Sequence, residues 1–191
     1  VDLNGEVIKT YAQFPYTIFM QKVGESVLMA STGFELALSM SKIDRQTFLY
    51  GYSKEYELNV IDADGNVLYR IKKDEPRPSF TSKERGEFKK IPVPENKPYF
   101  FSILNDSLGR VYLQRNYADG IRGRGPTDIR NKEIDLFSKD GYFLYKMILP
   151  ANTCVIKDGF LYAYKIDEDT AMEYVKRYRI KNWEKIGEGI K

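Results

Sequence analysis

Apolar and polar residues alternate along most of the chain, in short stretches separated by turn residues. The clearest case is 133–147, where two alternating runs flank Asp140-Gly141. Alternation with a period of two is typical of strands that bury one face, and Asp-Gly favours the tight turn of a hairpin. The same arrangement recurs at 57–71 and, in shorter form, at 1–10. The pattern therefore predicts a repeated antiparallel hairpin.

Further strands are predicted on either side of these hairpins. Strand pairs are expected at 16–31, 98–114 and 151–164, and a final alternating strand at 173–180. The stretch 32–56 is less regular, and it fits either an extra hairpin or, less well, a short helix near 36–40.

The region 72–97 differs from the rest because it is charged and interrupted by prolines. Thr81 is a suitable N-cap with acidic residues just after it, which predicts a short helix at 81–88. The region fits a domain linker or a long connection between repeats. We favour the connection, because the same hairpin pattern resumes after it.

Grouping the strands gives units of four, with a long loop between the second and third strands. Four-stranded units of about 40–50 residues are typical of β-propeller blades. The predicted fold is all-β, with about three four-stranded antiparallel blades forming a partial or half propeller. We expect one domain over 1–191, consisting of the end of one blade (1–10), a blade (16–71), an inter-blade loop (72–97), a blade (98–149) and an incomplete last blade (151–183).

This topology also predicts where a function would lie. In an up-and-down blade, the connections at 32–56, 72–97, 115–132 and 165–173 would share one face, and the tight turns the other. Binding residues usually lie on loops held by a rigid scaffold. We therefore expect the long-loop face to carry the function.

Composition excludes several kinds of chemistry. The chain has no histidine and one cysteine, which leaves no His-based catalytic triad, no His-ligated metal and no intrachain disulfide. The net charge of +3 is too small by itself to indicate a nucleic-acid partner. No apolar run is long enough for a transmembrane helix, and no signal peptide is recognisable.

The loop 116–132 contains the strongest candidate for a ligand site. Glycines alternate with arginines there, and freed backbone amides with guanidinium groups bind phosphate or carboxylate. The loop lacks the Lys-Ser/Thr ending of a Walker motif, and a simple surface loop is the alternative interpretation. The candidate ligand-binding residues are Tyr117, Asp119, Arg122, Arg124 and Arg130.

Other polar and aromatic residues favour structural roles. Asp62, Asp64, Asp135 and Asp140 suggest calcium, but the ligand spacing is incomplete, so we expect turn-forming aspartates. The acidic run at 167–169 fits a solvated loop better than a cation site. The aromatic set would stack on sugars or bases, or pack between blades, and we favour packing: Tyr69, Phe101, Tyr112, Phe137, Tyr145, Tyr162 and Tyr178.

Two single residues complete the predictions. Cys154 is expected to be a small core residue and Trp183 a packing anchor. We predict no metal ligands, no cofactor and no catalytic residues.

The segments 106–113 and 134–141 together resemble the blade pattern of bacterial NHL-like six-bladed β-propellers, and 178–183 resembles the closing strand of those proteins. The resemblance covers 98–183 and is weaker over 1–71. It implies an exported protein, periplasmic or at the cell surface, that acts as a binding or scaffold module. About half of a six-bladed ring is present, which suggests a fragment, an open arc or a homodimer that completes the ring.

The sequence thus predicts a non-enzymatic binding or scaffold module that recognises a protein or small ligand through long loops on one face. The alternative is a propeller hydrolase or lyase that uses carboxylate and arginine residues, with calcium at a central channel. Nucleic-acid binding is a distant third.

Overall fold

The computed structural model describes residues 9–15, 19–23, 26–30, 34–87, 94–117, 132–150, 153–167 and 169–188, with only the backbone described at 19–23, 26–30, 116–117 and 153–154. The described residues form four antiparallel sheets, one short α-helix and one 3₁₀ helix. The structure is therefore all-β, as predicted.

Three sheets follow one another along the chain, each with its strands in sequential order. The first contains β3 (Leu38–Lys42), β4 (Thr47–Tyr52), β5 (Glu57–Asp62) and β6 (Val67–Lys72). The second contains β7 (Ser102–Asn105), β8 (Val111–Tyr117), β9 (Lys132–Phe137) and β10 (Phe143–Leu149). The third has three strands, β11 (Thr153–Lys157), β12 (Phe160–Ile166) and β13 (Glu173–Arg179).

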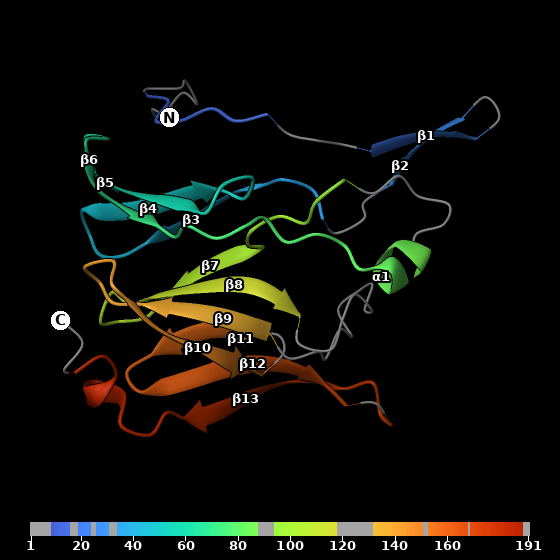
Figure 1. Ribbon diagram of the computed structural model, residues 1–191. Coiled ribbons are helices and arrows are strands. Elements are labelled where there is room, and N and C mark those ends of the chain that lie inside the picture. The colour runs from blue at the N-terminus through green and yellow to red at the C-terminus, as the bar shows by residue number, and fades with distance from the viewer. Residues whose placement is uncertain are drawn as a thin grey trace, which may run out of the picture.

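The sheets stack as propeller-type blades (Figure 1). Among the described strands, the backbones of different sheets approach each other mainly where β7 lies beside β3 and beside β11. The first strand of each sheet therefore lies nearest the others, as expected for blades arranged around an axis. The first and third sheets lie at opposite ends of the stack, so within the described part of the chain the three blades form an open arc and no closed ring.

The strand pairing changes the boundaries expected for the first blade. β1 (Phe19–Val23) and β2 (Ser26–Ala30) pair with each other in a separate two-stranded sheet. The stretch 32–56, expected to be a long connection, instead contributes β3 and β4 to the blade. The extra hairpin was thus the correct alternative, and no helix forms near 36–40. Strands form there because Leu49 points into the core while its neighbours Phe48 and Tyr50 point outward.

The repeated Asp-Gly turns form as the sequence predicts. At the β5–β6 turn, the Gly65 amide donates to the Asp62 carbonyl at 3.0 Å, and the Asn66 amide donates to the Asp62 carboxylate at 2.8 Å. Gly65 and Gly141 have φ angles of 82° and 87°, which residues with a side chain rarely adopt. These glycines therefore allow the tight reversals. The predicted hairpin at 1–10 lies outside the described residues, apart from Lys9 and Thr10.

The core lies between the sheets. One cluster joins the first and second sheets, and it includes Leu49, Leu58, Val60, Phe100 and Leu113. A second cluster joins the second and third sheets, and it includes Tyr112, Leu136, Leu144, Leu161 and Trp183. Each sheet of the pair contributes apolar side chains from one face, so the blades hold one another in place.

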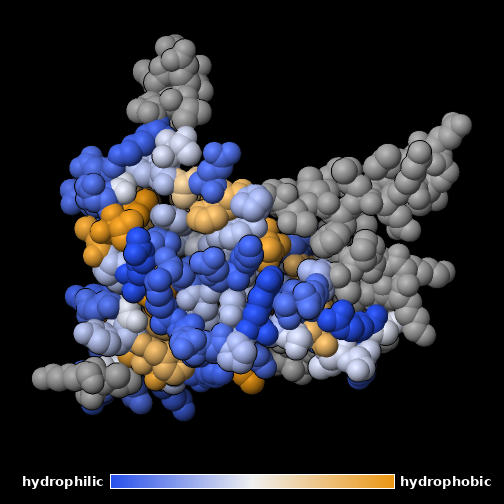
Figure 2. Space-filling view, turned by 45° about the horizontal axis from the view of Figure 1, so that its top comes forward, coloured by the Kyte–Doolittle hydropathy of each residue, from blue (hydrophilic) through white to orange (hydrophobic). Residues whose placement is uncertain are grey.

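Residues 9–15 lie across the outer face of the first sheet. The Phe14 ring stacks on Tyr52 at a centroid distance of 4.8 Å, and the Tyr52 hydroxyl donates to the Pro15 carbonyl at 2.7 Å. The Tyr11 hydroxyl donates to the Ala63 carbonyl at 2.9 Å. Figure 2 brings this side forward and shows small apolar patches separated by hydrophilic side chains.

No helix in the described part of the chain is long and apolar enough to cross a membrane.

Candidate functional site

The connections between strands lie at two opposite ends of the stack (Figure 1). The tight turns at 43–46, 63–66, 106–110 and 138–142 lie at one end, and 73–101 and 167–172 lie at the other. β8 ends and β9 begins at that second end, and the residues between them, 118–131, lie outside the described residues. Apart from 32–56, the described long connections therefore share one end, as the topology predicted, but the tight β4–β5 turn at 53–56 lies at that end too.

The turns at the first end pack against one another. A Cβ built on Gly109 would lie 3.2 Å from both Ile43 and Lys139, each on a different turn. The Tyr69 hydroxyl donates to the Lys139 carbonyl, and the Asp158 amide donates to the Ser107 hydroxyl at 3.0 Å. Contacts between neighbouring blades therefore hold these turns together.

The connection 73–101 at the other end is a built structure. Helix α1 (Ser82–Glu87) begins with a capping box, because the Thr81 amide donates to the Glu84 carboxylate at 2.7 Å and the Glu84 amide donates to the Thr81 hydroxyl at 3.2 Å. The predicted N-cap and helix are confirmed. The buried Lys97 ammonium pairs with Glu84 at 2.5 Å, which fixes the helix to the returning chain.

A group of charged and hydroxyl side chains joins this connection to the first two sheets. We call it the interblade charge cluster, and its members are Tyr56, Lys73, Glu75, Arg115 and Asp135. They come from the β4–β5 turn, the chain just after β6, β8 and β9. The cluster therefore unites four segments that are distant in the sequence.

Asp135 is the centre of the cluster and is almost fully buried, with 1 % of its surface exposed. Its Oδ2 atom accepts from the Tyr56 hydroxyl at 2.7 Å, the Lys73 ammonium at 3.0 Å and the Arg115 guanidinium at 2.8 Å. Glu75 pairs with Lys73 at 3.0 Å and also with Arg115. Two cations thus face two anions.

The Arg115 guanidinium has further fixed contacts. It donates through Nε to the Tyr99 carbonyl at 2.6 Å and lies over the Tyr56 ring at 4.4 Å. The Tyr99 hydroxyl donates to the Glu75 carbonyl at 2.9 Å. These contacts hold the start and the end of the 73–101 connection together.

The charge states in the cluster are well defined. Burial raises the pKa of Asp135, but hydrogen bonds from Tyr56 and Lys73 and the charges of Arg115 and Lys73 outweigh it, so the pKa is lowered overall. Burial, with the neighbouring carboxylate, raises the pKa of Tyr56 far above its usual range. Asp135 is therefore ionised and Tyr56 protonated at neutral pH, and neither is suited to exchange protons there.

A hollow of about 310 Å³ lies beside the cluster. Arg115 and Asp135 line it together with Glu133 and Lys146, which are charged and more exposed, and with apolar side chains of β9 and β10. It offers charges of both signs to a polar ligand or to a partner surface.

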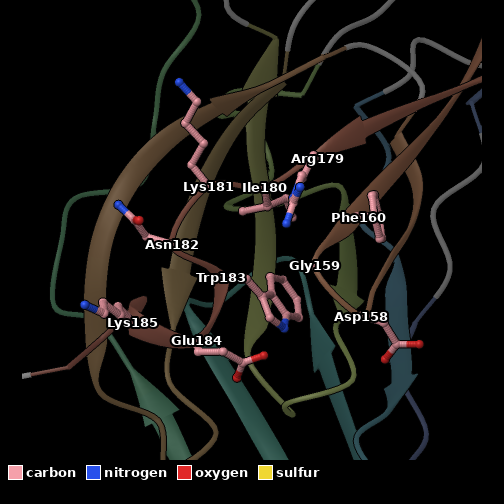
Figure 3. Close-up of a pocket in the computed structure, with 10 residues that line it drawn as sticks. All are labelled: Asp158, Gly159, Phe160, Arg179, Ile180, Lys181, Asn182, Trp183, Glu184 and Lys185. Carbon is pink, nitrogen blue, oxygen red and sulfur yellow. The ribbon is translucent and has the colours of Figure 1, made fainter.

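A second, larger hollow of about 590 Å³ lies at the tight-turn end of the third sheet (Figure 3). In this view Arg179 and Lys181 lie above the Trp183 ring, and Asp158 and Glu184 lie below it. Trp183 opens the 3₁₀ helix η1 (Trp183–Lys185) and is buried.

Trp183 is held by Arg110, whose guanidinium lies 4.0 Å from the ring centroid and donates to the Trp183 carbonyl at 2.9 Å. Arg110 also pairs with the buried Asp106 carboxylate at 2.6 Å. The predicted role of Trp183 as a packing anchor is confirmed.

The predicted ligand loop stays a prediction. Tyr117 ends β8 and only its backbone is described, while Asp119, Arg122, Arg124 and Arg130 lie outside the described residues. The side chain of Cys154 likewise lies outside them.

The four aspartates considered for calcium lie in different structural settings. Asp62 forms a turn with its carboxylate and Asp64 lies in the same turn, as expected, and Asp140 lies in the β9–β10 turn. The interpretation of Asp135 as a turn former was wrong, because it lies inside β9 and pairs with buried cations. Among the described residues, no group of three or more possible metal-ligating side chains occurs.

One feature of the sequence distinguishes Asp135 from a turn-forming aspartate. In the two hairpin repeats, Asn59 and Asp135 lie at the same spacing before the Asp-Gly turn. Asn59 accepts a hydrogen bond from Arg70 at 3.0 Å on the outer face of the first sheet. A carboxylate at the equivalent position of the second repeat, between two sheets, requires buried cations.

The aromatic set divides into packed and exposed members. Tyr112 and Phe137 are buried, and Tyr69, Phe101 and Tyr178 pack against the core clusters. Tyr145 is more exposed, at 36 %. Tyr162 pairs with Arg177, on the side of the third sheet away from the buried Leu161.

A comparison with models of known protein families finds no match, and neither does a search of curated proteins.

Proposed function

We propose that the protein is a non-enzymatic β-propeller-type module that binds a protein or small ligand at its long-connection end. The observation that carries the proposal is the separation of the two ends. At one end the tight turns of neighbouring blades pack against one another, while the other end presents helix α1 and the connection 73–101 on a fixed base. Loops on a rigid scaffold are the usual place for binding residues.

The interblade charge cluster supports this assignment because its groups are paired with one another. Asp135 has three partners, and Arg115 bonds to two carboxylates and a carbonyl. A group saturated in this way positions the connection and does not act as a free acid or base. The exposed Glu133 and Lys146 beside it remain accessible to a partner.

The NHL-like resemblance extends the proposal to an extracytoplasmic scaffold, periplasmic or at the cell surface. What supports this is the blade pattern of consecutive antiparallel sheets with four, four and three strands, in which β7 lies nearest to β3 and β11. Assembly of two copies into a six-bladed ring belongs to the same proposal.

Site-specific photocrosslinking tests where a partner binds. A photoreactive phenylalanine is placed at Lys83 or Asp169 on the long-connection end, and at Asp64 or Asp140 on the tight-turn end, all of which are exposed. In extracts of the source cells, we expect defined crosslinked products from the first pair and none from the second. Crosslinks from the tight-turn positions alone would overturn the assignment.

A second experiment tests the non-enzymatic part of the proposal. The variants Glu133→Gln and Lys146→Met alter accessible charges beside the cluster and should leave the fold intact. Turnover of any substrate by the wild type, abolished in either variant, would show that the hollow is an active site. We expect no such turnover.

A further inference from the structure

Among the described residues, the third sheet has one strand fewer than the first and second sheets. In the first and second sheets the third strands, β5 and β9, are each followed by a paired fourth strand. In the third sheet β13 occupies the third position and, among the described strands, pairs with β12 alone. Its other edge therefore presents unpaired backbone N–H and C=O groups.

Burial along these strands shows the same difference. β5 buries Leu58, Val60 and Ile61, and β9 buries four consecutive residues beginning at Ile134. None of the seven residues of β13 is buried, and Tyr174 and Val175 expose 45 % and 68 % of their surface. The position that is internal in the other two blades is an exposed edge here.

The described chain after β13 leaves this edge free. The Ile180 amide donates to the Gly159 carbonyl at 2.8 Å, and Asn182 adopts a left-handed conformation that turns the chain away. Arg110 then holds η1, and Gly187 packs against Leu144 of β10. The last described residues therefore pack on the second sheet and not along β13.

The edge is strongly basic. The stretch 173–181 contains four cations and one carboxylate, Glu173. The cations are Lys176, Arg177, Arg179 and Lys181. Arg179 and Lys181 also border the hollow of Figure 3, where Lys185 adds a further cation and Asp158 and Glu184 add two carboxylates. This charge disfavours pairing with a second copy of β13, because antiparallel pairing would oppose cations to cations.

We propose that the free edge of β13 binds an extended acidic segment of a partner protein, which adds as the fourth strand of the third sheet. Backbone hydrogen bonds to the edge would provide affinity, as in other cases of strand addition. Carboxylates of the segment would pair with Arg177 and Arg179, which lie two residues apart and so share one face of β13, with Arg179 at the hollow. The edge runs along β13 from the 167–172 connection to the tight-turn end, which is a different surface from α1 and 73–101, so this proposal stands without the proposed function.

The test uses a fluorescein-labelled octapeptide of alternating Val and Glu with blocked termini. Fluorescence anisotropy measures its binding, and amide hydrogen exchange measures protection at 173–179. We expect binding that weakens with salt, together with new protection confined to β13 and its neighbour β12. The same peptide with Lys in place of Glu, or with a central Pro, should bind at least about tenfold more weakly, because the ion pairs or the ladder are lost.

Matched protein variants locate the site. The double variant Arg177→Glu/Arg179→Glu should weaken binding of the acidic peptide by about tenfold or more, since two partly exposed ion pairs become repulsive. The variant Arg45→Glu/Lys54→Glu makes the same charge change at exposed positions of the first sheet's turns and should bind as the wild type does.

Three results would overturn the proposal. One is an acidic peptide that produces no protection of β13 amides. Another is equal binding of the acidic and lysine peptides. The third is strong protection of the outward amides of β13 in the free protein, which would show that another part of the protein or a second copy already occupies the edge.

Discussion

Replacement of Asp135 by Asn would test whether the interblade charge cluster holds the first two blades together. The amide is nearly isosteric and still accepts a hydrogen bond from Tyr56, but it removes the negative charge that faces Lys73 and Arg115. Removing one partner of a buried ion pair typically costs about 3–5 kcal/mol. Because Glu75 still pairs with both cations, we expect a loss near the lower end, about 3 kcal/mol.

Urea unfolding followed by circular dichroism measures this loss. With a slope of about 2–3 kcal/mol/M, the midpoint should fall by about 1–1.5 M. The melting temperature should fall by about 6–12 °C, since 1 kcal/mol corresponds to about 2–4 °C in a domain of this size. Asp140→Asn, at an exposed turn, is the control and should change stability by less than about 0.5 kcal/mol.

The pH dependence adds a second test. The pKa of Asp135 is lowered by folding, so its stabilisation is fully present above the ordinary value of 3.8 and is lost as the pH falls through the folded pKa. The difference between wild type and Asp135→Asn should therefore be constant from about pH 5 to 8 and shrink below about pH 4. A variant as stable as the wild type, or a difference that does not shrink in acid, would refute the reasoning.

Three further predictions concern packing, capping and assembly. Gly51→Ala should cost about 1–3 kcal/mol of unfolding free energy, because the new methyl would lie 2.5 Å from Leu58 and 2.9 Å from the Glu57 carbonyl. Gly86→Ala, with open space around it, should be neutral or stabilising by up to about 1 kcal/mol, and equal thermal shifts for the two would contradict the packing argument. Thr81→Ala should lower the free energy of opening α1 by about 1 kcal/mol, measured as faster amide exchange across the helix, while the melting temperature of the protein hardly changes. Unchanged exchange would show that the capping box does not stabilise the helix. Light scattering during size exclusion should give a mass near twice 22.2 kDa if two copies complete a six-bladed ring, whereas a monomer mass at all concentrations would exclude that assembly.

Local signals in the sequence were sufficient for much of the fold. The alternation around Asp64-Gly65 and Asp140-Gly141 predicted both hairpins, and the capping residues around Thr81 predicted α1. The assignment of strands to the first blade was less accurate. Hairpins at 19–30 and 38–52 have similar local patterns, and only pairing of β4 with β5 decides which of them belongs to the sheet.

The candidate site was less predictable than the fold for a different reason. Lys73, Arg115 and Asp135 are 20 to 62 residues apart in the chain, and each resembles an ordinary surface residue of a strand or loop. Their burial follows from the approach of two sheets, which no local pattern encodes. The same holds for Arg110, since its partner Trp183 lies 73 residues away.

The second sheet provides an arginine–aspartate pair with a buried aspartate to each of its two interfaces. Arg115 and Asp135 face the first sheet, and Arg110 and Asp106 face η1 and the third sheet. Apolar contacts between sheets supply stability but tolerate small sliding motions, whereas a buried charge is satisfied in one arrangement only. Arg115 reaches the Tyr99 carbonyl and Glu75, and Arg110 reaches the Trp183 carbonyl, so each arginine fixes a connecting segment as well as a sheet. We infer that the second sheet fixes the positions of the first and third sheets relative to itself. The long-connection end and the described edge of β13 then keep defined positions relative to one another, which the proposed scaffold with two binding sites would require.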